Sequence, residues 1–293
     1  MNARAKLRHL LKTEDMLVLP GAYDCITARL IERAGFSAVY MTGAGTAAIN
    51  GYPDYGLATM SELVQNAGRL ANAVSIPVIS DADTGYGNEL NVIRTVREFE
   101  RAGVAGIHIE DQVFPKKCGH LDDKELVSLD DYLVKIRAAA DARTDRDFLI
   151  IARTDARAPL GFEEAVRRSN AALKSGADMV FLEAPQTMEE VVSVPKLVKG
   201  PCLLNVVRGG KSPDVDLKEM RKAGYKIAIV PGLLMMAAVG ICEQMLAELK
   251  ASDRHPKPPG DLTVRQLFSR FGADEWDPLR DRYASLAKRQ AAE

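Results

Sequence analysis

The chain has 293 residues, of which 47% are hydrophobic and 27% charged, proportions typical of a globular protein with a large buried core. Its net charge of −1 gives no general attraction to nucleic acid or to an anionic membrane, and no apolar run approaches the roughly 18 residues that a membrane-spanning helix requires. The four cysteines are widely spaced and form no CxxC pair, which favours reduced thiols and a cytoplasmic location over a disulfide framework or a zinc cluster.

Short apolar segments alternate with amphipathic helical segments along most of the chain. The basic, amphipathic Met1–Lys12 is expected to form a short helix on the underside of the fold. The expected strands are Leu17–Leu19, Ala38–Met41, Val78–Ser80, Gly106–Ile109, Phe148–Ala152, Met179–Leu182, Cys202–Val206 and Ile227–Val230. The expected helices are Asp24–Ala34, Thr59–Ala73, Glu89–Ala102, Leu129–Arg143, Phe162–Ser175, Met188–Val198, Asp216–Lys222 and Leu233–Lys250.

Several of these helices carry the same predicted end signal. A cation in the last turn is followed by a glycine that can adopt the left-handed conformation. This pattern predicts helix ends just before Gly35, Gly103, Gly176 and Gly224.

Eight strands alternating with eight helices predict a parallel (β/α)₈ TIM-type barrel over residues 1–250. An open doubly wound sheet is the alternative, but the first βα turn lacks its GxGxxG fingerprint. His255–Gly260 is rich in proline and cannot be regular structure, and two short helices, Val264–Phe271 and Pro278–Arg289, are expected beyond it. We expect residues 251–293 to pack on the same barrel or on a neighbouring subunit.

Acidic residues follow several predicted strands, at the end of the barrel where active sites form. Asp81, Asp83, Glu110 and Glu183 would converge there. Four unpaired carboxylates need a compensating cation, and hard oxygen donors suit Mg²⁺ or Mn²⁺ rather than zinc. Because Mg²⁺ takes only one or two protein carboxylates, Asp83 is the best candidate for a direct ligand. Any one of these acids alone could be an exposed loop residue or a helix cap.

Candidate binding groups for substrate carboxylates follow two other strands. Arg153 ends a buried run, and its planar fork can bind a carboxylate through two hydrogen bonds. An ion pair with Glu183 or Asp155 is an alternative that does not exclude this role. The small-residue turn whose backbone N–H groups could hold a second carboxylate consists of Thr42, Gly43 and Ala44.

The segment Glu110–His120 places a thiol close to a pair of carboxylates. Cations beside a thiol lower its pKa, so Lys117 and His120 are expected to lower the pKa of Cys118 toward neutrality. The surrounding residues 112–128 are rich in charge and contain Gly119, which predicts a lid that closes over the site. Met235 and Met236, by contrast, are interpreted as core filling.

Four motifs of the chain are Asp81–Gly87 (DADTGYG), Glu110–Gln112 (EDQ), Lys116–His120 (KKCGH) and Ala152–Ala156 (ARTDA). Together they resemble the isocitrate lyase/phosphoenolpyruvate mutase superfamily, over about Pro20 to Leu249. The Lys-Lys-Cys-Gly-His loop is the most specific of them and points to the carbon–carbon lyase branch, which includes 2,3-dimethylmalate, 2-methylisocitrate and petal-death-type lyases.

The resemblance implies a Mg²⁺-dependent enzyme that binds small 2-hydroxy or 2-oxo carboxylic acids. It would cleave a 2-hydroxy di- or tricarboxylate to a 2-oxo acid such as pyruvate plus a carboxylate. It also implies a homotetramer in which the eighth helix is swapped between paired subunits. Two alternatives keep the fold: oxaloacetate hydrolysis or decarboxylation, and carboxyphosphonoenolpyruvate rearrangement. A third is a non-catalytic binding protein on a degenerate barrel.

Residue roles follow from the same resemblance. Asp83 would bind the metal, with Asp81, Glu110 and Asp54 ordering its waters. Tyr40 would be the base and Cys118 the proton donor, its pKa tuned by Lys117 and His120. Arg208 and Leu233 stand where related enzymes carry glutamate and serine or threonine, so both bear on the substrate's second carboxylate and C3 substituents. The residues implied to stabilise charge or bind substrate are Arg153, His120, Glu183, Asn205, Gly119, Thr42, Gly43, Ala44 and Arg208.

Overall fold

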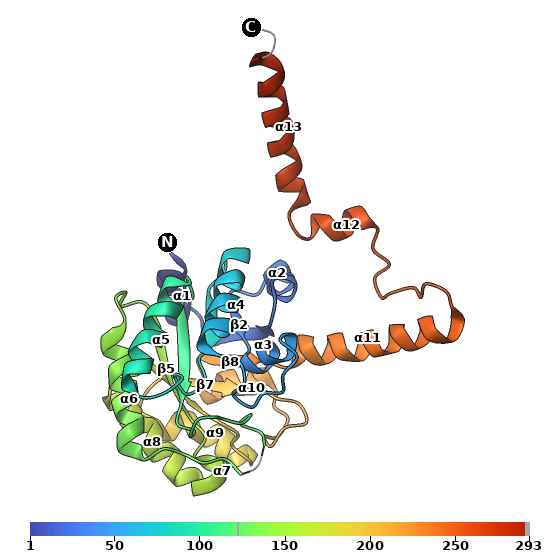
Figure 1. Cartoon of the computed structure of the whole chain (residues 1–293). Helices are drawn as coiled ribbons and strands as arrows, with labels where there is room; N and C mark the ends of the chain where they lie inside the picture. Colours follow the sequence, from blue (N-terminus) through green and yellow to red (C-terminus); the bar gives the residue numbers. More distant parts are fainter. Residues whose placement is uncertain (122, 291–293) are drawn as a thin grey trace. The chain divides into compact units, whose positions relative to one another are not determined.

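The structure, a computed structural model, describes residues 1–121 and 123–290. All eight predicted strands form, each pairs in parallel with the next, and β8 pairs with β1 to close the barrel (Figure 1). The predicted (β/α)₈ TIM-type fold is therefore confirmed. The strands are β1 Leu17–Ala22, β2 Val39–Met41, β3 Val78–Asp81, β4 Gly106–Glu110, β5 Leu149–Thr154, β6 Met179–Leu182, β7 Cys202–Asn205 and β8 Ile227–Val230.

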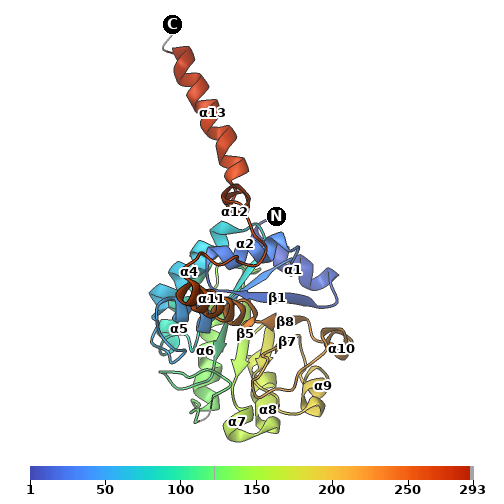
Figure 2. The same ribbon diagram turned by 90° about the vertical axis from the view of Figure 1, so that its right-hand side faces the viewer.

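Helices surround the strands, as Figure 2 shows for α8, α9 and α10 on the outside of the barrel. The predicted helices match within two residues, except that the helix expected at Pro278–Arg289 begins at Ala273, with Pro278 inside it. Gly35, Gly103, Gly176 and Gly224 all have positive φ angles, as their end signals require. The helices around the barrel are α1 Ala3–Thr13, α2 Cys25–Arg33, α3 Gly43–Ile49, α4 Met60–Ala73, α5 Glu89–Arg101, α6 Leu129–Ala142, α7 Arg157–Leu160, α8 Phe162–Lys174, α9 Met188–Leu197 and α10 Leu217–Ala223.

Two of these helices, α3 and α7, were not expected. The predicted turn Thr42-Gly43-Ala44 is in fact the start of α3, with Thr42 at the N-cap and its Oγ1 accepting from the Gly45 N–H at 3.3 Å. Gly43 is needed there, because a Cβ on it would lie 2.5 Å from Asp81 Oδ2. The glycine and alanine residues of α3 give no apolar periodicity, which is why the sequence did not reveal the helix.

Two apolar cores hold the barrel together. One lies inside the strands and includes Leu19, Ile79, Ile151 and Phe181, while the other lies between strands and helices. Leu7 of α1 belongs to the inner core. Its helix therefore closes the bottom of the barrel, as predicted, and leaves the opposite end for the site.

The chain divides into two compact units, Met1–Ala237 and Ala238–Glu293. The helices of the C-terminal part are α11 Leu233–Ser252, α12 Val264–Ser269 and α13 Ala273–Gln290. The predicted boundary after residue 250 remains a prediction. Among the helices of residues 1–121 and 123–290, none is long and apolar enough to cross a membrane.

Candidate active site

A cavity of about 190 Å³ opens where the strands end. It brings together residues from most of the strands, several of them polar. Gly43, Asp83, Glu110, Lys117 and Arg208 do not line it. The predicted site residues that do are Tyr40, Thr42, Ala44, Asp54, Asp81, Cys118, Gly119, His120, Arg153, Glu183 and Asn205.

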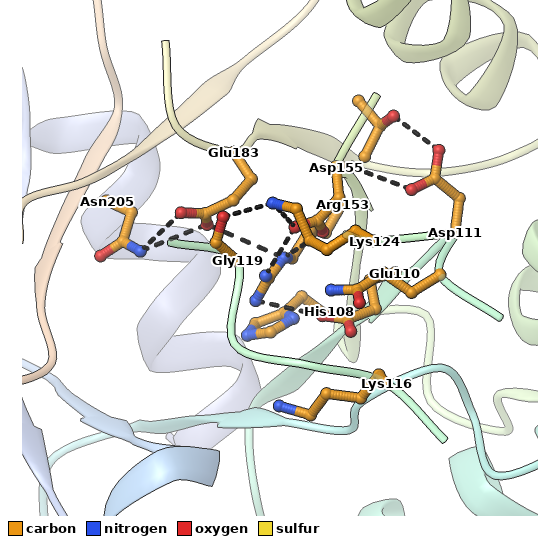
Figure 3. Close-up of polar contacts among 12 residues, drawn as sticks. His108, Glu110, Asp111, Lys116, Gly119, Lys124, Arg153, Asp155, Glu183 and Asn205 are labelled. Carbon is orange, nitrogen blue, oxygen red and sulfur yellow. Dashed lines mark hydrogen bonds and ion pairs between the residues drawn. The ribbon is translucent and has the colours of Figure 1, made fainter. Parts of the chain in front are cut away.

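Arg153, in β5, is the central cation of the site (Figure 3). Its Nη1 lies 3.1 Å from Glu110 Oε2, its Nε lies 2.9 Å from Asp155 Oδ2, and its guanidinium lies over the ring of Phe181. Burial alone would lower its pKa, but Asp155, Glu110 and Glu183 raise it well above its usual value. Arg153 therefore keeps its charge inside the barrel and can face an anionic substrate group.

Glu183 follows β6 and joins the cysteine loop to the barrel. His120 Nε2 lies 2.9 Å from Glu183 Oε1, and Asn205 Nδ2 donates to Glu183 Oε2 at 3.2 Å. The other ring nitrogen, His120 Nδ1, accepts the backbone N–H of Lys211 at 3.0 Å, so the imidazole proton faces Glu183. Burial opposes ionisation of Glu183, but Arg153 and His120 hold its pKa below the usual value.

Asp111, which sequence reasoning did not assign, supports this group from behind. Its Oδ2 accepts from Thr154 Oγ1 at 2.6 Å and from Arg168 Nη1 at 3.0 Å, and its Oδ1 accepts the Asp155 N–H at 2.8 Å. Asp111 is completely buried. It therefore fixes the ends of β4 and β5, which carry Glu110 and Arg153, relative to one another.

The acidic cluster predicted to bind a metal comprises Asp54, Asp81, Asp83 and Glu110. Asp83 has a positive φ of 45°, and its N–H donates to Asp81 Oδ1 at 2.9 Å. Burial raises the pKa of Asp83 to about 6 and that of Glu110 well above its usual value. Asp81 is also buried, but His108, Lys116 and Arg153 outweigh burial and lower its pKa to about 2.

Among the described residues, Glu110 Oε1 is buried without any partner, and Glu110 Oε2 has only its ion pair with Arg153. Within the described part of the chain, however, no three His, Cys, Asp or Glu side chains form a ready-made metal site. The carboxylates of the acidic cluster are hard oxygen donors that lie too far apart to bind one ion together. Such an arrangement suits a cation that is bound by one or two carboxylates and several waters.

Lys116, a residue that the sequence analysis left unassigned, already supplies one positive charge to the acidic cluster. Its buried ammonium lies 2.5 Å from Asp54 Oδ1 and 3.0 Å from Asp83 Oδ1. Burial would lower its pKa, but these two aspartates, with Glu110 and Asp81, raise it well above the usual value. The cysteine loop therefore reaches the acidic cluster through Lys116.

The hydroxyl group of Tyr40, which lines the cavity, makes two polar contacts. It lies 2.8 Å from His108 Nε2 and 3.4 Å from Asp81 Oδ2. Burial, with a further contribution from Asp81, raises the pKa of Tyr40 well above its usual value. The phenol therefore keeps its proton in the resting site and is not, by itself, the base that we expected.

The pKa of Cys118 moves in the direction opposite to our expectation. Burial of the half-buried thiol raises it, with further contributions from Asp54 and Glu183. The ammonium of Lys117 does not oppose this, because it lies away from the cavity and donates to the carbonyl oxygen of Asp123 at 3.3 Å. The thiol is thus protonated at neutral pH, the state that a proton donor needs.

Part of the cavity lining is apolar. Val207, Met235 and Met236 belong to it, so the interpretation of the two methionines as core filling was wrong. Arg208, predicted to bind substrate, is exposed beside Val207, and Leu233 is 53% exposed; neither lines the cavity.

A (β/α)₈ barrel whose mouth joins a buried arginine, a protonated thiol and an acidic cluster defines an enzyme of small carboxylic acids. More particularly, the chain belongs to the phosphoenolpyruvate mutase/isocitrate lyase superfamily: the family described as phosphoenolpyruvate phosphomutase matches residues 7–250. Enzymes of this superfamily depend on a divalent metal ion.

The chain is 47% identical to 2,3-dimethylmalate lyase of Eubacterium barkeri over 272 residues, which cover 92% of this chain and 93% of the relative. It is also 47% identical to 2-methylisocitrate lyase of Aeropyrum pernix over 243 residues, 83% of this chain and 78% of the relative. Among solved structures, oxaloacetate acetylhydrolase in complex with the inhibitor 3,3-difluorooxalacetate superposes with a TM-score of 0.93 at 39% identity, covering 97% of each chain. The two lyases confirm the carbon–carbon lyase branch that the cysteine loop indicated.

Proposed function

We propose that this protein is a Mg²⁺-dependent carbon–carbon lyase. Its substrate would be a 2-hydroxy di- or tricarboxylate of the 2,3-dimethylmalate or 2-methylisocitrate kind, and its products a 2-oxo acid such as pyruvate and a second carboxylate. The observation that carries the proposal is that Cys118, Arg153 and two acids of the cluster, Asp54 and Asp81, line one small cavity. Identity of 47% to two named lyases supports it.

Asp83 is the proposed metal ligand, with Asp81, Glu110 and Asp54 ordering the metal's waters. Mg²⁺, or Mn²⁺ in its place, suits these oxygen donors and when bound would make the 2-hydroxyl group of the substrate more acidic. Glu110 Oε1, which is buried without a partner in the described chain, supports this assignment.

Arg153 would bind the substrate carboxylate, and Tyr40 would accept the hydroxyl proton. Because Tyr40 is itself protonated, it would pass its own proton to His108, whose Nε2 is 2.8 Å away; burial lowers the pKa of His108 to about 4, so its imidazole is neutral in the resting site. The C2–C3 bond then breaks, its electron pair goes to C3, and the C2 oxygen becomes the ketone oxygen of the 2-oxo acid.

The charge that develops on the departing carboxylate would face His120, Asn205 and Arg153, with Glu183 holding the first two in place. Cys118 then transfers its thiol proton to C3, which completes the second carboxylate product. Gly119 brings the loop close to Arg153, and its backbone would contact the bound acid. Thr42, Gly43 and Ala44 would direct the N–H groups at the start of α3 toward the second substrate carboxylate.

A pyruvate-coupled assay tests this function directly. The purified enzyme with Mg²⁺ should release pyruvate from 2,3-dimethylmalate or 2-methylisocitrate, and Cys118→Ser should not. The similarity to oxaloacetate acetylhydrolase makes hydrolysis of oxaloacetate the second candidate. Acetate and oxalate formed from oxaloacetate, without cleavage of either hydroxy acid, would favour that alternative.

We further propose a cytoplasmic homotetramer. Helix α11 is apolar over most of its length and needs a surface to cover it, which supports exchange of this helix between paired subunits. All four cysteines are free, as expected for a reducing compartment. Light scattering on the purified protein would measure the mass of the assembly; a monomer at micromolar concentration would contradict the proposal.

A further inference from the structure

Lys124 is a buried lysine that neither the motifs nor the proposed reaction uses. Only 1% of its side chain is exposed, although it lies in a polar segment after the cysteine loop. Its ammonium donates to the carbonyl oxygen of Gly119 and to Asp155 Oδ1, the latter at 3.1 Å (Figure 3). Burying an ammonium is costly unless its partners are fixed, so both contacts require explanation.

The two partners of Lys124 both hold Arg153. Asp155 accepts from Arg153 Nε at 2.9 Å and from Nη2 at 3.1 Å, which sets the plane of the guanidinium. Gly119 lies against the same group, since a Cβ on it would be 2.5 Å from Arg153 Nη2 and 2.6 Å from Glu183 Cγ. The ammonium of Lys124 thus connects the cysteine loop, through Gly119, with Asp155.

Lys124 also changes the balance of charge around Arg153. The guanidinium alone faces three carboxylates, those of Glu110, Asp155 and Glu183. A substrate carboxylate would add a fourth negative charge. Lys124 supplies a second cation at Asp155 and neutralises part of its negative charge. The positive charge of Arg153 is therefore less completely balanced by the protein's own carboxylates and can attract the substrate carboxylate.

We propose that Lys124 is a positioning residue that couples closure of the cysteine loop to the orientation of Arg153. With the loop in place, Lys124 fixes Asp155 and Gly119 at once, so the thiol and the arginine reach their working positions together. Movement of residues 116–120 away from Arg153 would break the contact between Lys124 and the carbonyl oxygen of Gly119. The part of this proposal that concerns substrate binding rests on the proposed lyase function, whereas the part that concerns the loop does not.

The first test measures how accessible Cys118 is without any substrate. Lys124→Met removes the charge and keeps the length of the side chain, and the rate of Cys118 alkylation by iodoacetamide is followed by mass spectrometry of its peptide. We expect alkylation at least five-fold faster than in the wild type. Glu125→Met, at an exposed neighbouring position, should stay within two-fold. Cys202, buried in β7, should remain unmodified in every variant, which excludes global unfolding as the cause.

The second test uses steady-state kinetics with 2,3-dimethylmalate and Mg²⁺. Lys124→Met should raise KM and lower kcat/KM at least ten-fold, and Lys124→Arg should recover part of the loss because it restores the charge. In the Asp155→Asn background, Lys124→Met should cause little further loss, because the carboxylate that Lys124 holds is already gone. If Lys124→Met does not fold, Lys124→Gln is measured in the same way with the same expected direction.

The two tests can give negative results independently of one another. If no hydroxy acid is cleaved by the wild type, the proposed function is wrong, but the alkylation rates still decide whether Lys124 holds the loop. Equal alkylation of Cys118 in the wild type and in Lys124→Met would overturn the inference. So would additive kinetic losses from Lys124→Met and Asp155→Asn in an active enzyme.

Discussion

Replacing Cys118 with serine changes the chemistry of the proton donor while keeping its size and place. The backbone N–H of residue 118 donates to the carbonyl oxygen of Asp54 at 3.1 Å, a contact that the substitution leaves intact. A serine hydroxyl is far less acidic than a thiol, so the variant loses general-acid catalysis, which contributes roughly 10²- to 10⁴-fold, or about 3–5 kcal/mol. We expect kcat to fall by that factor and KM to change little.

The pH dependence gives an independent check on the same residue. Because the pKa of Cys118 is raised above its usual value, the thiol is fully protonated at neutral pH and loses its proton only in alkaline solution. The wild-type kcat should therefore be constant through neutral pH and decline above the raised pKa; in Cys118→Ser that decline should be missing. Pyruvate release followed between pH 6 and 10 measures both quantities. A kcat for Cys118→Ser within ten-fold of the wild type would refute the role of the thiol.

Asp111→Ala removes the fully buried carboxylate that pairs with Arg168 and, within the described residues, leaves Arg168 only Glu164 as an acidic partner. It should lower the free energy of unfolding by roughly 3–5 kcal/mol, measured by urea denaturation. A loss below about 1 kcal/mol would mean that Asp111 does not hold β4 and β5 together. Gly119→Ala places a Cβ 2.5 Å from Arg153 Nη2 and should lower kcat/KM at least ten-fold with an unchanged melting temperature. Full activity of that variant would show that the loop does not lie against Arg153 during turnover. Removing divalent metal with EDTA should abolish pyruvate release, and Mg²⁺ or Mn²⁺ should restore it; undiminished activity in EDTA would contradict the metal assignment to Asp83.

The fold was predictable because its signals are local. Each strand is a short apolar run, and the helices end where a cation precedes a glycine, as at Gly103 and Gly176. Helix α3 has no such signal, since its stability comes from the Thr42 cap and from close packing of Gly43 against Asp81. A contact between residues 38 positions apart cannot be read from either segment alone.

Most residues of the site could be predicted from the sequence, but their pKa shifts and ion pairs could not. The strand-end rule and the family resemblance identified Arg153, and the cysteine loop was recognised from its motif. The sequence neighbours of Cys118 suggested a lowered pKa, yet burial and acids from distant segments raise it. Lys116 and Lys124 were missed for the same reason, because their partners, such as Asp54 and Asp155, are brought to them only by the fold.

The most direct test of the central claim is a ¹H NMR time course of 2,3-dimethylmalate with the purified enzyme and Mg²⁺. Cleavage of the C2–C3 bond must convert each molecule to one pyruvate and one propionate, because the thiol proton of Cys118 ends on the former C3. We predict equimolar appearance of both products at the rate at which the substrate disappears. An unchanged spectrum for 2,3-dimethylmalate and 2-methylisocitrate alike, under conditions in which oxaloacetate is hydrolysed, would contradict the account.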